Sequence, residues 1–186
     1  MITRFSVLQR WLHWLMAVMV IAMLFIGIGM VSTVQPRFGT LVAVHRPLGI
    51  AILLLAMVRL AVRWRRGTPP LPADLPAWQT FGAKASHVLL YALLLAMPLI
   101  GWSMLSAGGY PIVLWGPLRL PAIMPHDDSL YAVLRGAHTV LALLLFATIL
   151  LHLAAALFHA LARRDGVFAS MVPFASRNTP VGPKLG

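Results

Sequence analysis

The sequence predicts an all-α membrane protein, a bundle of four transmembrane helices that forms a single domain over residues 1–186. Three observations lead to this fold class. Hydrophobic residues make up 60% of the chain and charged residues only 10%, whereas a typical soluble domain is about a quarter charged. Four long apolar runs follow one another along the chain. Basic residues outnumber acidic ones by 15 to 4, and they gather between those runs.

Each apolar run is long enough to cross a bilayer, which takes about 20 residues. In hydrocarbon the backbone can bond only to itself, so each run must be helical. We place the spans at about residues 11–31, 41–62, 86–106 and 136–162. We expect the first to be retained as a helix, because it contains His13 and no clear signal-peptide cleavage site follows it.

The connecting segments differ in composition. The segment from 107 to 130 is rich in Pro and Gly, and Asp128 or Ser129 is expected to cap the helix that follows. The polar tail after Arg164 is expected to be loosely ordered. The chain has no cysteine, which excludes disulfides, thiolate metal sites and covalent c-type haem attachment.

The basic residues predict the orientation of the bundle. Loops on the cytoplasmic side of a membrane carry more Lys and Arg, so both termini are expected in the cytoplasm. The bases form no continuous stripe, which argues against nucleic acid as a partner. The cytoplasmic set is Arg4, Arg10, Arg59, Arg63, Arg65, Arg66, Lys84, Arg163, Arg164, Arg177 and Lys184, and the opposite set is Arg37, Arg46, Arg119 and Arg135.

Several histidines lie within the spans, where an ionisable side chain is costly and usually functional. His138 and His152 are fourteen residues apart, about 21 Å along a helix and within about 40° of one face. The spans then place His13 level with His152, and His45 level with His138. Each histidine alone is also explained by a hydrogen bond between helices.

Two level pairs of neutral imidazoles suit two haems, because each iron takes one histidine on either side. The i, i+4 spacing that favours a single-ion site does not occur. Arg59 lies at the depth of the inner pair, where a haem propionate needs a cation, although an arginine near a helix end also snorkels to the interface. Arg46 and Arg135 are candidates for the same role at the outer haem.

At this point the sequence resembles the bacterial cytochrome b561 family, which consists of four-helix di-haem cytochromes of the inner membrane. The resemblance covers nearly the whole chain, and the order and spacing of its short motifs are specific. They are Arg10-Trp11-Leu12-His13-Trp14, His45-Arg46-Pro47-Leu48-Gly49-Ile50, Val58-Arg59-Leu60, Ser86-His87, Met97-Pro98-Leu99-Ile100-Gly101, Gly136-Ala137-His138 and Leu151-His152-Leu153-Ala154-Ala155-Ala156 with His159.

The resemblance implies two non-covalent b haems, with His13, His45, His138 and His152 as ligands to their irons. His87 remains a competitor of His13, because it also lies near the inner surface. The implied reaction is that of a superoxide oxidase: superoxide gives an electron to the outer haem, and the inner haem reduces ubiquinone.

Quinone reduction needs proton donors near the cytoplasmic surface. His159 lies about 10 Å beyond His152 along the helix and is the first candidate, followed by Lys84 and His87. The alternative function is a cytochrome b subunit that links a dehydrogenase or another redox protein to the quinone pool. A haem-free transporter or metal channel is a third possibility, which the lack of carboxylates within the spans disfavours.

Overall fold

The computed structural model describes residues 4–33 and 36–173. Within them the chain forms four long helices: α1 (Val7–Ser32), α2 (Arg37–Arg66), α3 (Ala77–Ala107) and α4 (Asp128–Leu157). All four are long and apolar enough to cross a membrane, as the sequence predicts. Arg177 and Lys184, two of the bases used to orient the chain, lie outside the described residues.

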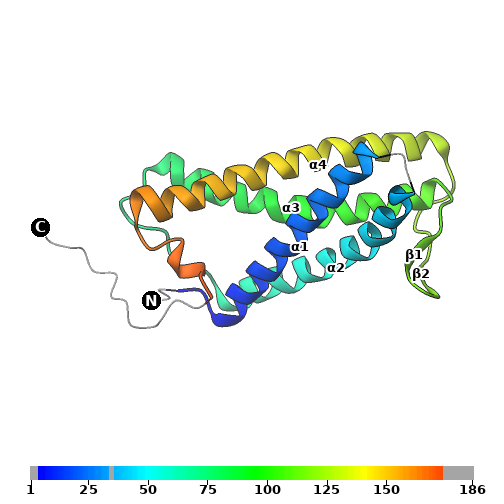
Figure 1. The fold of residues 1–186 in the computed structure, drawn as a ribbon. Coiled ribbons are helices and arrows are strands. Elements are labelled where there is room, and N and C mark those ends of the chain that lie inside the picture. The colour runs from blue at the N-terminus through cyan, green and yellow to red at the C-terminus, as the bar shows by residue number, and fades with distance from the viewer. Residues whose placement is uncertain (1–3, 34–35, 174–186) are drawn as a thin grey trace, which may run out of the picture.

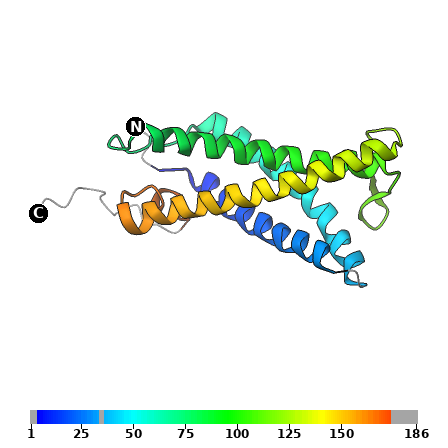
Figure 2. The same ribbon diagram turned by 90° about the horizontal axis from the view of Figure 1, so that it is seen from above.

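The helices pack as two hairpins. α1 lies against α2, α3 lies against α4, and α2 joins the two hairpins by packing on α3. Figures 1 and 2 show α3 and α4 running side by side along the molecule. α1 begins and α4 ends at the same end of the bundle (Figure 1), which we call the basic end. The opposite end, where a short β-hairpin connects α3 to α4, we call the hairpin end.

The hairpin end takes its name from a feature that the sequence reading did not foresee. Strands β1 (Ile112–Trp115) and β2 (Leu118–Leu120) pair antiparallel in the connection between α3 and α4. Gly116 turns the chain between them with a φ of 50°, which an L side chain rarely adopts. Arg46 of α2 donates a hydrogen bond of 3.1 Å to the Pro111 carbonyl, which holds the hairpin against α2.

Side-chain caps begin α1 and α4, and an unexpected segment follows α4. The cap of α4 is Asp127, whose carboxylate accepts from the Leu130 N–H at 2.9 Å, one residue before the expected Asp128 or Ser129. After α4 the chain forms a π-helical turn, η1 (Phe158–Arg163), and then a 3-10 turn, η2 (Ala169–Met171). The expectation of a loosely ordered tail after Arg164 is therefore wrong for residues 165–173.

A small core lies halfway along the bundle. Leu145, seven residues from both His138 and His152, belongs to it, so the core separates the two ends that carry the histidines. Most other large apolar side chains face outward, as expected for helices whose solvent is lipid. The core residues are Met16, Val20, Ile52, Ala56, Leu93, Leu94 and Leu145.

Candidate functional site

Two histidines face each other near the hairpin end. The ring centroids of His45 on α2 and His138 on α4 are 6.2 Å apart, with an interplanar angle of 63°. Gly101 of α3 lies beside this pair, and a Cβ there would come within 3.4 Å of His138 Cε1. The absence of a side chain at Gly101 therefore leaves room for the His138 ring.

A second pair lies toward the basic end. The ring centroids of His13 on α1 and His152 on α4 are 6.3 Å apart, with an interplanar angle of 73°. His87 of α3 also lies close to His152, with the two ring centroids 5.4 Å apart. The structure thus brings together both pairs that the depth estimate predicts, and it places the competing His87 beside the inner one.

The spacing of the two pairs matches a single metal atom between each. A metal–imidazole bond of about 2 Å plus about 1.1 Å from nitrogen to ring centre, counted on both sides, gives about 6.2 Å. His87 and His152 are closer than this. The Nδ1 atoms of His13 and His45 are also buried without a hydrogen-bond partner in the described part of the chain. The residues therefore fit bis-histidine ligation of two haems, with His13 a better match than His87.

Both pairs join helices that make little direct contact, and this boundary between α4 and the α1–α2 hairpin is called the seam below. His13 and His45 stand on the α1–α2 hairpin, whereas both of their partners stand on α4. Among the described residues, the extensive helix contacts are α1 with α2, α2 with α3, and α3 with α4, and no comparable contact joins α4 to α1 or α2. A flat macrocycle held between facing histidines would fill this seam.

Two arginines accompany the pairs. Arg59 of α2 lies near the inner pair, where its guanidinium is 5.5 Å from the Tyr91 ring centroid and its Nη1 is 3.6 Å from Met16 Sδ. Arg46 follows His45 directly, and its Nε is buried without a partner in residues 4–33 and 36–173. Neither guanidinium forms an ion pair with a carboxylate of the described chain, so each is suited to an anionic group such as a propionate.

The remaining candidates differ in their surroundings. Lys84 at the start of α3 and Arg135 on α4 are both exposed, so the structure does not enclose them as it does Arg46 and Arg59. His159 is largely enclosed, with 15% of its side chain exposed, and its Nδ1 is 2.6 Å from Asp165 Oδ2.

Asp165 is the centre of a polar network that sequence reasoning missed. Its Oδ2 also accepts from Arg163 Nε at 3.0 Å, and its Oδ1 accepts from the Val167 N–H at 3.2 Å. Arg163 Nη2 reaches Asp74, in the connection between α2 and α3, at 2.6 Å. Burial raises the pKa of the Asp165 carboxyl, but the hydrogen bonds from His159, Val167 and Arg163 outweigh it and hold that pKa below its ordinary value.

The segment after Asp165 returns to α1 beneath the inner pair. Trp14 Nε1 donates to the Met171 carbonyl at 3.0 Å, and Arg10 Nη1 donates to the Val172 carbonyl at 2.8 Å. This segment, residues 165–173, is called the strap below. It connects the end of α4 to the start of α1, the two helices that carry His152 and His13.

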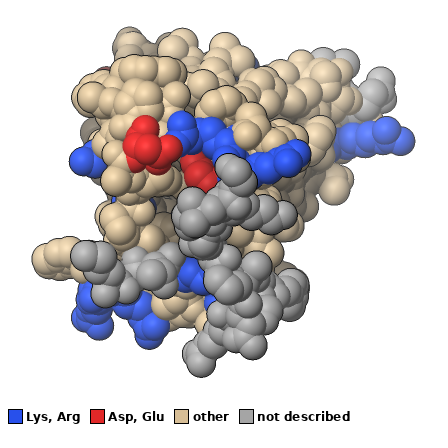
Figure 3. Space-filling model, turned by 90° about the vertical axis from the view of Figure 1, so that its left-hand side faces the viewer, with Lys and Arg blue, Asp and Glu red and all other residues tan. Residues whose placement is uncertain are grey.

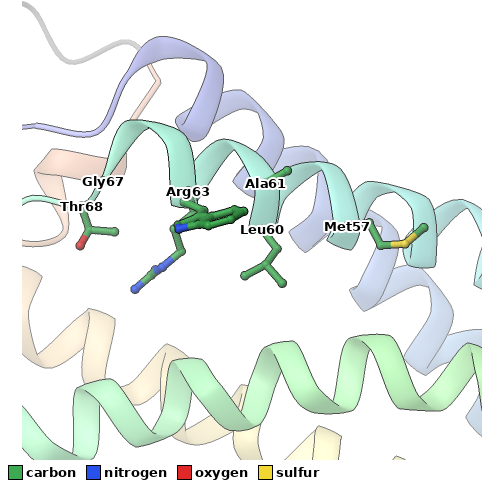
Figure 4. Close-up of a pocket in the computed structure, with 7 residues that line it drawn as sticks. Met57, Leu60, Ala61, Arg63, Gly67 and Thr68 are labelled. Atoms are coloured by element: carbon green, nitrogen blue, oxygen red, sulfur yellow. The ribbon is translucent and has the colours of Figure 1, made fainter.

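A cavity of about 640 Å³ lies along α2 at the basic end. Figure 4 shows Arg63 and Leu60 projecting from α2 into this space, with another helix running opposite. Arg63 also lines a second, small cavity together with Arg59, His87 and Tyr91. The full lining is Met57, Leu60, Ala61, Arg63, Trp64, Gly67 and Thr68.

The basic end carries most of the charge of the molecule. Figure 3, which views the left-hand side of Figure 1, shows Lys and Arg side chains across this face with a small acidic group among them. Asp74 is 75% exposed and Asp165 only 11%. Half of the four acidic residues in the chain thus lie at this end, paired with Arg163 or His159.

Comparisons with known proteins agree with this arrangement. A family model described as prokaryotic cytochrome b561 matches residues 4–174. Cytochrome b561 homolog 1 of Escherichia coli (strain K12) is 28% identical over 178 residues, which cover 91% of this chain and 97% of the relative. A probable superoxide oxidase of Yersinia pestis is 31% identical over 176 residues, covering 91% and 96%. Cytochrome b561 homolog 2 of Escherichia coli is 32% identical over 139 residues, covering 72% of each.

Proposed function

Because this chain belongs to the prokaryotic cytochrome b561 family, we propose that it is a superoxide oxidase, a membrane enzyme that passes electrons from superoxide to ubiquinone. The family accounts for the coarser properties: a multi-pass inner-membrane protein that transfers electrons by means of b-type haem. The superoxide reaction rests on the likeness to the probable superoxide oxidase of Yersinia pestis, which extends over nearly the whole of both chains.

One observation supports the proposal most strongly: two histidine pairs, at opposite ends of the bundle, are both spaced for one metal atom. Two haems would therefore be held, one by His45 and His138 and the other by His13 and His152. When bound, they supply reversible one-electron storage on both sides of the membrane core. Arg46 and Arg59 would hold their propionates by charge-assisted hydrogen bonds.

The overall reaction takes two superoxide anions, one ubiquinone and two protons, and yields two dioxygen molecules and one ubiquinol. Each superoxide loses one electron and no proton, so its side needs no acid or base. Ubiquinone gains two electrons and two protons. We place this step at the basic end, facing the cytoplasm as the excess of bases there favours.

The enclosed His159 lies in η1, seven residues after His152 in the sequence. It is our first candidate for the group that hydrogen-bonds the quinone and supplies a proton. His87, which lines the cavity with Arg59 and Tyr91, and the exposed Lys84 are the further candidates. The apolar cavity beside Arg63 offers a hydrophobic molecule a path from the bilayer to this end.

The test uses the purified full chain in liposomes containing ubiquinone, with superoxide generated enzymatically. We expect a haem count of two per chain, reduction of the haem spectrum by superoxide, and one ubiquinol for every two superoxides consumed. Superoxide dismutase should abolish the signal. A protein that superoxide does not reduce, and that exchanges electrons only with quinol and an added redox protein, would overturn the proposal in favour of an electron-transfer subunit.

A further inference from the structure

The carboxylate of Asp165 has a chemical role that follows from its position. We propose that Asp165 is a positioning residue for quinone reduction: it holds the His159 imidazole in one orientation and stabilises that ring when it carries the proton destined for the quinone. This proposal rests on the proposed function and on the role assigned there to His159.

The first support is the hydrogen-bond geometry. A carboxylate that accepts from both Arg163 Nε and the Val167 N–H is held in its ionised form. An ionised carboxylate can only accept, so His159 Nδ1 must carry a hydrogen and donate it across the 2.6 Å contact. Nε2 is then the ring nitrogen left for a substrate. Outer partners of this kind fix the tautomer and the orientation of a histidine ring.

The second support is the backbone that makes the contact possible. Asp165 comes six positions after His159 in the sequence, which on a continuous α-helix would place the two on different faces. The π-helical turn over Phe158–Arg163 widens the helix, and its last bond runs from the Arg164 N–H to the His159 carbonyl at 2.8 Å. Arg164 then adopts the left-handed conformation with a φ of 53°. These two irregular features turn the chain back, and single π-helical turns are frequent at functional sites.

The third support is the enclosure of the pair within a charged surface. The side chains of His159 and Asp165 are 15% and 11% exposed, whereas Asp74, on the far side of Arg163, is 75% exposed. The charged groups around His159 are therefore Asp165 in contact with it, and then Arg163 and Asp74 in succession. Protons from the cytoplasm can reach this end while the acid–base pair itself stays oriented.

The matched variants are Asp165→Asn and Asp74→Asn. Both remove one carboxylate that pairs with Arg163, but only Asp165 touches His159. In haem-loaded full-length protein, we expect Asp165→Asn to lower kcat for reduction of a short-chain ubiquinone about tenfold at neutral pH, the lower limit for loss of an outer partner. KM and the rate of haem reduction by superoxide should change less than about twofold, because the Asp165–His159 contact serves only proton delivery to the quinone. Asp74→Asn should resemble the wild type.

Two further variants separate positioning from a merely structural role. Asp165→Glu restores a carboxylate and should recover most of the rate. In a His159→Gln background, Asp165→Asn should cost nothing more, because residues that act as a unit are not additive. A full tenfold loss in that background would overturn the proposal, and so would a haem count that falls with the rate and is not restored by Asp165→Glu.

The outcomes also separate this proposal from the function on which it rests. A normal kcat in Asp165→Asn together with a slow His159→Gln protein would refute the role of Asp165 and leave His159 in place. A His159→Gln protein as fast as the wild type would refute both residues, with quinone reduction itself intact. A wild-type protein that forms no ubiquinol would contradict the proposed function instead.

Discussion

The two ends of the bundle hold the same kind of histidine pair in very different surroundings. At the hairpin end, His45 and His138 lie beside Arg46 and beside Gly101, whose lack of a side chain leaves space for the His138 ring. At the basic end, His13 and His152 have a third histidine beside them, and His159 and Asp165 lie further along the same end. The histidine pair is therefore duplicated, but the titratable groups beside it differ in burial: the side chains of His159 and Asp165 are 15% and 11% exposed at the basic end, whereas those of His126 and Asp128 are 65% and 92% exposed at the hairpin end.

This difference follows the chemistry of the two proposed half-reactions. Oxidation of superoxide to dioxygen releases one electron and no proton. A site for this step needs only an accessible electron acceptor and a positive electrostatic potential that attracts the superoxide anion. Reduction of a quinone consumes two protons, and proton transfer requires positioned groups with suitable pKa values. The enclosed His159–Asp165 pair is therefore consistent with the proposal that the quinone is reduced at the basic end.

The largest effect is expected from the histidines of the basic end. His13→Ala removes a ligand whose ring is spaced for one metal atom from His152, and we expect the haem count to fall from two to one per chain. His87→Ala leaves both spaced pairs in place and should keep two haems. A haem count by pyridine haemochromogen on both variants decides between the two histidines, and the opposite result would assign the ligand to His87.

A smaller effect is expected from the gap at Gly101. The branched side chain of Gly101→Val would press on His138, because even a Cβ there comes within 3.4 Å of Cε1. We expect the hairpin-end haem to be lost or weakly bound while the other stays. Gly27→Val on α1 is the control, since nothing lies within 4 Å of a Cβ at that position. Equal haem loss in both variants would show a general packing defect instead.

The smallest effect is expected from the two arginines. A nearby positive charge stabilises the reduced, more negative haem, so Arg59→Gln should lower the reduction potential of the basic-end haem by about 60 mV, which is tenfold in the equilibrium for one electron. Arg46→Gln should do the same at the hairpin end. Redox titration of the two spectra measures this, and a shift of the wrong haem in either variant would reverse the assignment of the ends.

Much of the architecture could be predicted because a bilayer leaves the chain few choices. Length and hydropathy define the four helices, and a spacing of fourteen residues places His138 and His152 on one face of α4. The pairing of His13 with His152 and of His45 with His138 followed from depth alone, and the ring distances agree with it. Whether these residues bind haem stays a prediction.

The parts that could not be predicted depend on backbone irregularity or on contacts distant in sequence. The β1–β2 pairing lies in a segment rich in Pro and Gly, and the cap of α4 is one residue away from the expected position. The sequence of the strap indicated only a polar tail, because its residues give no sign of the hydrogen bonds that its carbonyls accept from the distant Trp14 and Arg10. Asp165 gave a faint signal as one of only four acidic residues, six positions after His159.

The sparse contact between α4 and the α1–α2 hairpin has a consequence for biogenesis. Each histidine pair has its second member on α4, which is made after α1, α2 and α3, so under the proposed ligation neither haem site is complete until α4 has been inserted. The proposed haems would then be the main link between α4 and the α1–α2 hairpin, which share few direct contacts in the described part of the chain. A variant truncated before α4 is therefore expected to bind no haem, and its absorption spectrum would show this.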